Sequence, residues 1–486
     1  MTSRSPFTLA RAAGALLLAL IMTGCASTSG IAPVATKIDP KSIGLVDGAV
    51  LSEFAADWWR AFNDRALVDI VDRALSGNPT LRVAEGRIQR ARAAADTARA
   101  SDGLQVTGDA NATRQRFSEN SIYPPPLGGS TRTLGTAQIN GAWEFDFFGR
   151  NRSAIEAAVG AEQAARADVD AARVLLATQV VRQYVQLARL VELRAIATRA
   201  LEQRTQTLAL IRQRVANGLD TNVELRQGEA TVPEARRQIE EIDAQIAVAR
   251  HALAALTVQS PDAYATLAPA LVMPAVLTIP ESVPADLLGR RADIQAARWR
   301  IEAATSDVAA AKAQFYPNIS LTAFVGLASI GLSNLVNAGS LQYGIGPALH
   351  LPIFDAGRLR ANLRGKASDL DAAVATYNGA VIDAVRDVAD QLTSVRSLER
   401  QQAEERDTLA AAESALDLAT QRYRAGLSTY LTVLTVESSV LTERRNTAEL
   451  RARDIDTRIA LIRALGGGYV PTTTQGSTQV LTQGRS

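Results

Sequence analysis

Residues 104–113, LQVTGDANAT, decide the fold class, because apolar and polar side chains alternate along them. Alternation with a period of two is typical of a β-strand that has one apolar and one polar face. The pattern predicts a strand over about 104–117, and the same alternation predicts three more strands at about 134–146, 317–328 and 341–353. Segments rich in turn-forming residues join the first strand to the second and the third to the fourth, so we expect two hairpins.

Helix-favouring sequence lies on both sides of each hairpin. Alanine-rich segments without internal proline precede the hairpins at about 79–100 and 293–314. Proline-free stretches follow them at about 153–217 and 358–425, and at about 1.5 Å per residue each would be about 100 Å long. A helix of that length does not fit in a compact domain. Apolar residues recur in both long stretches at a three-four spacing, which predicts packing against other helices.

The chain carries an internal duplication. The turn sequence GLDTNVEL at 218–225 returns as GLSTYLTV at 426–433, 208 positions later. Gly149 and Gly357, in FGRNRSA and AGRLRAN, have the same offset. A repeat of this length predicts one structural unit of about 210 residues that occurs twice. The expected organisation is a segment at 25–63, repeats at 64–270 and 271–468, and a tail without stable structure at 469–486.

The N-terminal residues have the pattern of an export signal. Arg4 and Arg11 precede the apolar run AAGALLLALIM, which is too short to span a membrane. The next residues, MTGC, resemble a bacterial lipoprotein cleavage box and contain the only cysteine, Cys25. We therefore expect a lipoprotein signal peptide at 1–24 and a lipid on Cys25; the alternative is an ordinary cysteine after a plain signal. Ala26 follows, and the resemblance then implies an outer-membrane destination.

Composition excludes several classes of function. The formal charge of +2 provides no global field that would attract nucleic acid. With two histidines, His251 and His350, and a single cysteine, the chain has few residues for thiolate metal sites or histidine-dependent catalysis. We expect no catalytic residues, no cofactor and no metal site.

Four alternating strands in an exported chain fit an outer-membrane β-barrel, with lipid on the apolar face and water on the polar face. A soluble sandwich with one wet face is the alternative, although no further strands are expected that could cover the apolar faces. Four strands cannot close a barrel, since known single-chain barrels have at least about eight. Copies of the chain must therefore assemble: three would give an even antiparallel ring of twelve strands, and two would give a narrow pore filled by side chains. The fold class that we predict is an α+β membrane protein with a duplicated unit of helix, hairpin and long helix, in which several copies contribute four strands each to one barrel and the long helices continue it as a helical tube.

Several motifs together resemble the outer-membrane factor family, the TolC-like channels of tripartite efflux pumps, and in particular its lipoprotein branch. They include DWWRAFND, WEFDFFGRNRSAIEAA, ADLLGRRADIQAARWRIEAA, LPIFDAGRLRANL and IALIRALGGGY, in this order along the chain. Two residues depart from the usual pattern: Ala292 stands where the family has proline after paired arginines, and Pro233 lies inside an expected helix.

The resemblance implies a homotrimer, and with it a 12-stranded outer-membrane barrel of four strands per chain that is continued by a long periplasmic α-helical barrel. It also implies contacts with outer-membrane lipid, a periplasmic adaptor protein and an inner-membrane efflux transporter. It implies a passive exit duct for small molecules such as drugs, toxic compounds or metal ions, and no role for nucleic acid. Two other functions remain open: a type I secretion conduit for polypeptides, and a lipid-anchored periplasmic coiled-coil scaffold without a pore.

In this family the two repeated turns lie at the end of the helical tube that is farthest from the barrel, around the periplasmic opening. The expected turn tips are Gly218, Leu219, Thr221, Gly426, Leu427 and Thr429, and both glycines suit the left-handed position after a helix. The resemblance suggests four gate candidates: Asp220, Glu224, Tyr423 and Arg424. The structural alternative is that Asp220 caps the next helix and that Glu224 is a solvated first-turn acid.

Overall fold

The structure is a computed structural model that describes residues 27–45, 55–120, 122–273 and 287–469. The predicted signal peptide, Cys25 and almost all of the predicted tail lie outside the described residues. Within these ranges no helix is both long and apolar enough to cross a membrane. The chain divides into two units, each assembled from segments of both halves of the sequence: 1–37, 87–166 and 296–378 in the first, and the remaining residues in the second.

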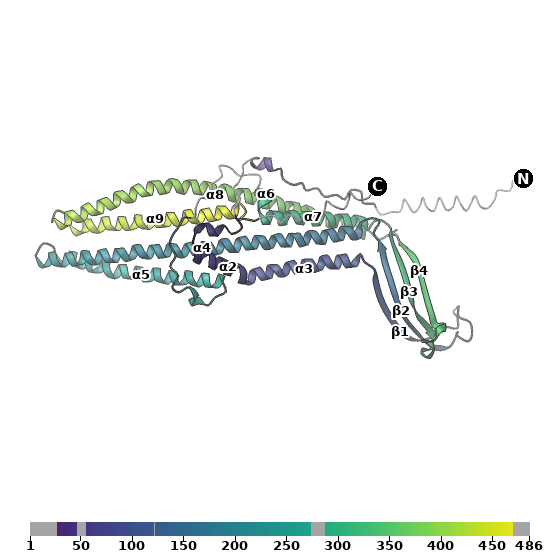
Figure 1. Ribbon diagram of the computed structural model, residues 1–486. Coiled ribbons are helices and arrows are strands. Elements are labelled where there is room, and N and C mark those ends of the chain that lie inside the picture. Colours follow the sequence, from purple (N-terminus) through teal and green to yellow (C-terminus); the bar gives the residue numbers. More distant parts are fainter. Residues whose placement is uncertain (1–26, 46–54, 121, 274–286, 470–486) are drawn as a thin grey trace, which may run out of the picture. The chain divides into compact units, whose positions relative to one another are not determined.

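The first unit contains one four-stranded antiparallel sheet in the order β1-β2-β3-β4 (Figure 1). The strands are β1 (Gln105–Arg116), β2 (Thr131–Phe145), β3 (Asn318–Ile330) and β4 (Leu341–His350). All four lie where the alternation predicts them, with small differences at the ends. β2 begins earlier than expected because Thr131 still pairs with Arg116 of β1. β4 ends earlier, just before Leu351-Pro352, because proline has no N–H group to donate to a neighbouring strand.

The strand register gathers the apolar side chains on one face of the sheet. Val106 lies opposite Gly141, which lies opposite Ala323, which lies opposite Ile345. Neighbouring rows on this face contain mostly apolar residues: Leu104, Ala110, Ala137, Ile139, Trp143, Phe145, Ile319, Leu321, Val325, Leu327, Leu341, Tyr343, Pro347 and Leu349. Many of these side chains are exposed; Ile345 and Tyr343 are more than three-quarters exposed. The apolar face is therefore uncovered in the single chain.

The opposite face is polar and is linked by side-chain hydrogen bonds. Asn140 donates to the Asp109 carboxylate at 2.6 Å, Gln138 donates to Asn140 at 2.9 Å, and Gln342 donates to Gln138 at 3.1 Å. The last contact reaches over β3 at Gly326, where a Cβ atom would lie 2.4 Å from the Gln138 Cβ. The sheet thus has two chemically distinct faces, as the alternation predicts.

Four helices begin or end beside this sheet: α3 (Pro79–Ser101), α4 (Arg150–Ala216), α7 (Ala292–Ala313) and α8 (Arg358–Arg424). Within the first unit, α7 and α8 share an apolar core that includes Ile301, Phe315 and Leu363. α4 lies close to α7 at Gly160, where a Cβ atom would meet Ala303 at 3.1 Å. Helices of this kind pack through small residues that let the backbones approach.

The second unit is helical. Besides parts of α3, α4 and α8, it contains α2 (Arg65–Gly77), α5 (Asn222–Leu256), α6 (Leu287–Arg290) and α9 (Tyr430–Ala464). Several residues at the three-four spacing of α4 and α8, such as Val181, Tyr184 and Val388, are buried. Trp58 and Trp59 are buried in the core of this unit with their rings 5.9 Å apart, so packing is their role here. Short 3-10 turns complete the structure at Pro40–Ile43, Trp58–Phe62, Pro261–Tyr264, Leu332–Asn334 and Ala338–Ser340.

The lengths of the helices reflect the duplication. α4 and α8 each have 67 residues, and α5 and α9 each have 35. The α4–α5 and α8–α9 connections are the two repeated turn sequences at Gly218 and Gly426.

Candidate functional site

The two repeated turns have the same backbone structure. Gly218 and Gly426 have positive φ angles of 71° and 75°, as predicted for residues that follow a helix. The amide of Leu219 donates to the Arg214 carbonyl at 2.9 Å, and the amide of Leu427 donates to the Arg422 carbonyl at 2.8 Å. Both turns thus end a long helix with a Schellman motif, and each leaves its leucine well exposed at the tip.

The helices that follow the two turns begin differently. Thr221 is the N-cap of α5 and forms a capping box with Glu224, whose carboxylate accepts the Thr221 amide at 2.9 Å. The expectation that Asp220 caps this helix is therefore wrong: the cap is the next residue. In the second turn Thr429 occupies the N-cap of α9 without a side-chain hydrogen bond to the backbone, and Thr432 stands where the first turn has Glu224.

Asp220 instead joins the first turn to the end of α8. Its carboxylate accepts Arg214 Nε at 2.9 Å and Nη2 at 3.2 Å, and the hydroxyl of Tyr423 at 2.6 Å. The Arg214 guanidinium also lies 4.7 Å from the centre of the Tyr423 ring. We call Arg214, Asp220 and Tyr423 the tip cluster. Its side chains are nearly buried, with Tyr423 only 1% exposed, so water competes weakly for these contacts.

The electrostatics of the tip cluster favour a charged aspartate and a neutral tyrosine. Burial would raise the pKa of Asp220, but the hydrogen bonds from Arg214 and Tyr423 outweigh it and hold that pKa below its ordinary value. Burial and the hydrogen bond to Asp220 raise the pKa of Tyr423 well above its ordinary value. Arg214 neutralises Asp220 within the chain, so Asp220 contributes an ion pair to the tip and not a free negative charge.

An apolar cluster surrounds these polar contacts. It contains Ile211, Leu416, Tyr430, Val433 and Val440 together with Tyr423. The two tyrosine rings, Tyr423 and Tyr430, lie 6.1 Å apart. Side chains of α4, α8 and α9 therefore pack together at the tip. A change in the packing of one turn affects the packing of the other.

A second, buried ion pair lies farther along the same helices. Arg204 of α4 donates to Glu437 of α9 at 3.1 Å and to the Thr231 carbonyl of α5 at 3.2 Å. Glu437 is 1% exposed, and burial raises its pKa although Arg204 opposes the shift. One guanidinium thus ties three helices together.

The tip cluster forms at the first turn and has no counterpart at the second. At the 208-residue offset, Arg214 corresponds to Arg422, Asp220 to Ser428, and Tyr423 to Val215. The Ser428 hydroxyl is buried and has no hydrogen-bond partner among the described residues. The sequence identified Asp220 and Tyr423 as neighbours of the tip but missed Arg214, Arg204 and Glu437. An arginine six positions before an aspartate across a glycine turn is a signal that could have identified Arg214.

The remaining predicted tip residues lie at the surface. Arg424, the last residue of α8, is exposed and has no ion pair among the described residues. At the start of α5, Thr221 is exposed and Glu224 is partly exposed. The structure brings Asp220 and Tyr423 together and leaves Arg424 apart from them.

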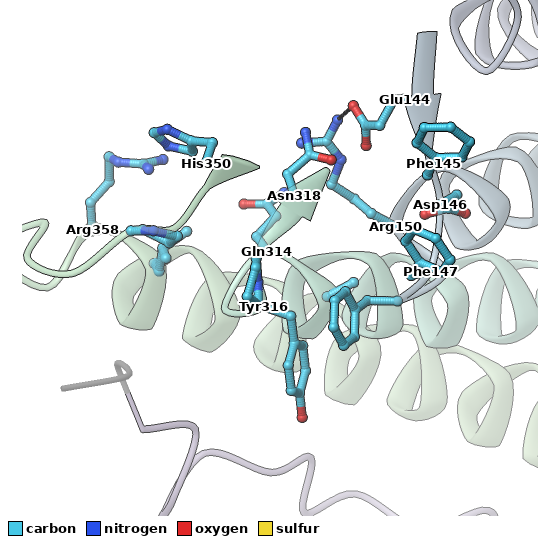
Figure 2. Close-up of a pocket in the computed structure, with 15 residues that line it drawn as sticks. Glu144, Phe145, Asp146, Phe147, Arg150, Gln314, Tyr316, Asn318, His350 and Arg358 are labelled. Atoms are coloured by element: carbon cyan, nitrogen blue, oxygen red, sulfur yellow. Dashed lines mark hydrogen bonds and ion pairs between the residues drawn. The ribbon is translucent and has the colours of Figure 1, made fainter. Parts of the chain in front are cut away.

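A pocket of about 340 Å³ lies where the strands meet the helices (Figure 2). In it Arg150 donates to Glu144 at 2.6 Å, and His350 and Arg358 lie on its other side. Asp146 accepts the amides of Asn151 and Arg152 at the start of α4. In the second repeat Asp355 accepts the amides of Gly357 and Leu359 at the start of α8. The repeated Gly-Arg motifs are therefore helix starts, and this region has a structural role.

Among the described residues, no group of three histidine, cysteine, aspartate or glutamate side chains is placed to hold a metal ion. The groups of the tip cluster do not suggest catalysis. The Asp220 carboxylate is neutralised by Arg214 and the Tyr423 phenol is neutral, so the cluster provides neither a nucleophile nor a general base near neutral pH. What this arrangement can do is hold helix ends together.

The chain is similar in sequence to known outer-membrane efflux and resistance proteins. A family model described as outer membrane efflux protein matches residues 70–258 and 283–467. The multidrug resistance outer membrane protein MdtQ of Escherichia coli O157:H7 is 33% identical over 426 residues, which cover 85% of this chain and 88% of that protein. The fusaric acid resistance protein FusA of Burkholderia cepacia is 37% identical over 359 residues, which cover 72% of this chain and 67% of that protein.

Solved structures with the same fold include outer-membrane proteins. The crystal structure of VceC from Vibrio cholerae has a TM-score of 0.80 at 36% identity and covers 85% of this chain and 99% of that chain. The outer-membrane channel OprN has a TM-score of 0.79 at 29% identity and covers 91% of this chain and 98% of that chain.

Proposed function

Because the chain belongs to the outer membrane efflux protein family, we propose that three copies of it form a channel whose barrel crosses the outer membrane and whose helices extend into the periplasm. The channel is the passive exit duct of a tripartite efflux pump. Its cargo consists of small molecules, as the names of the multidrug and fusaric acid resistance relatives suggest. An inner-membrane transporter and a periplasmic adaptor deliver that cargo.

The single observation that carries this proposal is the sheet with an uncovered apolar face and two open edges. β1 and β4 are edge strands, so their outer backbone groups lack partners within the sheet. Unpaired backbone groups in lipid cost several kcal/mol each, so a sheet in a membrane must close on itself. Three copies of four strands make twelve, an even number that suits an antiparallel barrel.

The polar face then lines the pore and the apolar face meets lipid. The hydrogen-bonded row from Gln342 to Asp109 lies on the pore side, where water replaces lipid as the neighbour. This assignment agrees with the outward apolar bands of known barrels, about 25 Å tall.

The tip cluster acts as an intrachain clasp at the periplasmic mouth. Tyr423 and Asp220 join the end of α8 to the first turn, so opening of the mouth by separation of these helix ends requires the hydrogen bond between them to break. The exposed residues Leu219, Leu427 and Arg424 surround the clasp and are available to a partner protein or a neighbouring copy. An adaptor that binds these exposed groups more tightly in the open state than in the closed state would favour the open state.

Lipid anchoring through Cys25 completes the proposal. It is supported by the short apolar run and the MTGC sequence before the mature chain. A lipid at this position would hold the N-terminal segment at the membrane surface near the barrel.

Planar-bilayer recording tests the channel function. The purified protein should insert and give discrete ionic conductance steps of uniform size. A protein that is folded by circular dichroism, forms oligomers and never conducts, even after Tyr423→Phe, would contradict the proposal and favour a scaffold without a pore.

A further inference from the structure

The apolar face of the sheet has a definite height. Its lower limit, beside the helices, is the row Phe145, Ile319 and Leu349. Its upper limit is the row Ala112, Gly135 and Ser329, where the first polar side chain of this face appears. Ten residues of β2 separate Phe145 from Gly135. At about 3.3 Å per residue this is about 33 Å along the strand, and at the 35–45° tilt of barrel strands it gives about 25 Å of vertical height. The apolar face therefore matches the hydrocarbon thickness of an outer membrane.

Two arginines lie on this same face just beyond its upper limit. Arg114 is opposite Thr133 and Arg116 is opposite Thr131, so both follow Ala112 at the two-residue spacing of one face. Arg114 is exposed and forms no ion pair among the described residues. Arg116 is exposed and lies 3.2 Å from Glu119, a pair whose side chains are both about 70% exposed. Water and anions can therefore reach both guanidinium groups.

The lower border of the apolar face has a different chemistry. Trp143, Phe145 and Phe147 form a ladder with ring centres 4.6 and 5.8 Å apart, and Phe148 stacks on Tyr316 at 4.8 Å. Arg150, at the start of α4, is paired with Glu144, which belongs to the polar face. One border of the sheet is thus aromatic, and the other carries two outward-facing cations.

We propose that Arg114 and Arg116 bind the phosphate groups of phosphorylated lipids in the outer leaflet of the membrane. This inference rests on the proposed function, since it requires that the apolar face meets lipid and that the end of β1 far from the helices lies at the cell surface. Guanidinium groups bind phosphate through paired hydrogen bonds, and the (CH₂)₃ stems of arginine can cover the last apolar rows while the charge stays at headgroup level.

The alternative ligand for these arginines is water alone, as for most surface arginines. Position argues against that reading, because two cations on the membrane side of a strand, within two and four residues of the hydrocarbon limit, would lie in the headgroup layer. Arg132 provides an internal contrast. It pairs with Gln115 at the same end of the sheet but on the polar face, so its charge points to the pore side.

The test compares lipid binding by three full-length variants in their oligomeric form. Wild type, Arg114→Gln with Arg116→Gln, and the control Arg132→Gln are placed in detergent with bis-phosphorylated lipid A, and bound lipid is counted by native mass spectrometry. We expect the double variant to bind about fivefold more weakly per arginine lost, with a smaller difference at high salt. Arg132→Gln should bind like wild type, and the variant Arg114→Lys with Arg116→Lys should retain most of the binding.

Three results would overturn the inference: equal binding by the double glutamine variant, an equal loss in Arg132→Gln, or equal binding of wild type to lipid A from which both phosphates have been removed. The same spectra report the number of copies. A wild-type oligomer with no phosphate-dependent lipid would refute only the lipid site, whereas a wild-type monomer would refute the proposed barrel.

Discussion

The hydroxyl of Tyr423 donates a hydrogen bond of 2.6 Å to the carboxylate of Asp220, a residue 203 positions away in the sequence. The bond joins the end of the second long helix to the turn that follows the first. Arg214 pairs with the same carboxylate of Asp220. The two halves of the duplicated chain are therefore fastened together at their turns by a contact that neither half could make alone.

Removal of the Tyr423 hydroxyl should loosen the periplasmic mouth. Tyr423→Phe keeps the ring and its packing but removes a hydrogen bond to a charged group, which is worth about 1.5–3 kcal/mol. We expect the ratio of open to closed channels to rise by about tenfold or more in planar-bilayer recordings. Arg424→Ser is the comparison, because Arg424 takes no part in this cluster. Unchanged conductance in Tyr423→Phe would show that the clasp does not control the mouth.

The tip cluster should respond to acid. Its hydrogen bonds lower the pKa of Asp220 below the value of about 3.9 that it has when unfolded. A carboxylate with a lowered pKa stabilises the folded contact above the unfolded pKa, and that stability is lost as the pH falls through the folded pKa. We therefore expect the clasp to hold down to about pH 4 and channel opening to increase below it. Asp220→Asn should remove this acid-dependent step; its persistence in that variant would assign the step to another group.

The buried pair of Arg204 and Glu437 should contribute far more to stability than an exposed pair. Arg204→Met leaves the Glu437 carboxylate buried without a partner, which costs about 3–5 kcal/mol. Arg444→Met, which breaks the more exposed pair with Glu413, is the matched control and should cost less than about 1 kcal/mol. Denaturant unfolding followed by circular dichroism measures both free energies.

The stability that Arg204→Met loses should depend on pH, and this dependence checks whether Glu437 is the charge left unpaired. Burial raises the pKa of Glu437, and the loss of Arg204 removes the contact that opposes this shift. A raised carboxyl pKa means that the folded state gains stability as the pH falls through it. The deficit of Arg204→Met should therefore shrink between pH 8 and pH 5. Equal deficits at both pH values would mean that Glu437 is not the charge left unpaired.

The two faces of β3 should tolerate a charge very differently. Val325→Lys places an ammonium on the apolar face near its middle, which costs about 2–4 kcal/mol in a membrane barrel. Thr322→Lys, three residues away on the polar face, should fold with nearly wild-type yield. Refolding yield into lipid vesicles measures both. Equal tolerance of the two lysines would contradict the assignment of faces to lipid and pore.

Lipid attachment at Cys25 is tested by metabolic labelling with palmitate. The wild-type protein should incorporate the label, and Cys25→Ser should not, since the chain has no other cysteine. Equal labelling of both proteins would refute the anchor.

Much of the fold follows from the sequence because its patterns are local. Alternation in LQVTGDANAT predicts β1, and proline-free stretches predict α4 and α8 to within three residues at each end. The positive φ angles of Gly218 and Gly426 follow from their place after a helix. The repeat is visible in both sequence and structure, since the paired helices have equal lengths.

The candidate site was only partly predictable because its contacts are not local. The sequence placed Asp220 and Tyr423 near the same tip, but the bond between them depends on how α8 packs beside the first turn. Arg204, Glu437 and Thr231 come from three helices, and their spacing in the sequence does not indicate that they are in contact. The expected helix cap at Asp220 was wrong by one residue, because Thr221 is the N-cap and forms the capping box with Glu224. Asp220 bonds to the other members of the tip cluster instead.

The number of copies in the membrane form tests the central claim most directly. The four-stranded sheet with its open β1 and β4 edges requires partners, and three copies close a twelve-stranded barrel. Native mass spectrometry of the detergent-solubilised protein should therefore give three times the mass of one mature chain. A folded monomer that persists in detergent and in lipid vesicles would contradict the account.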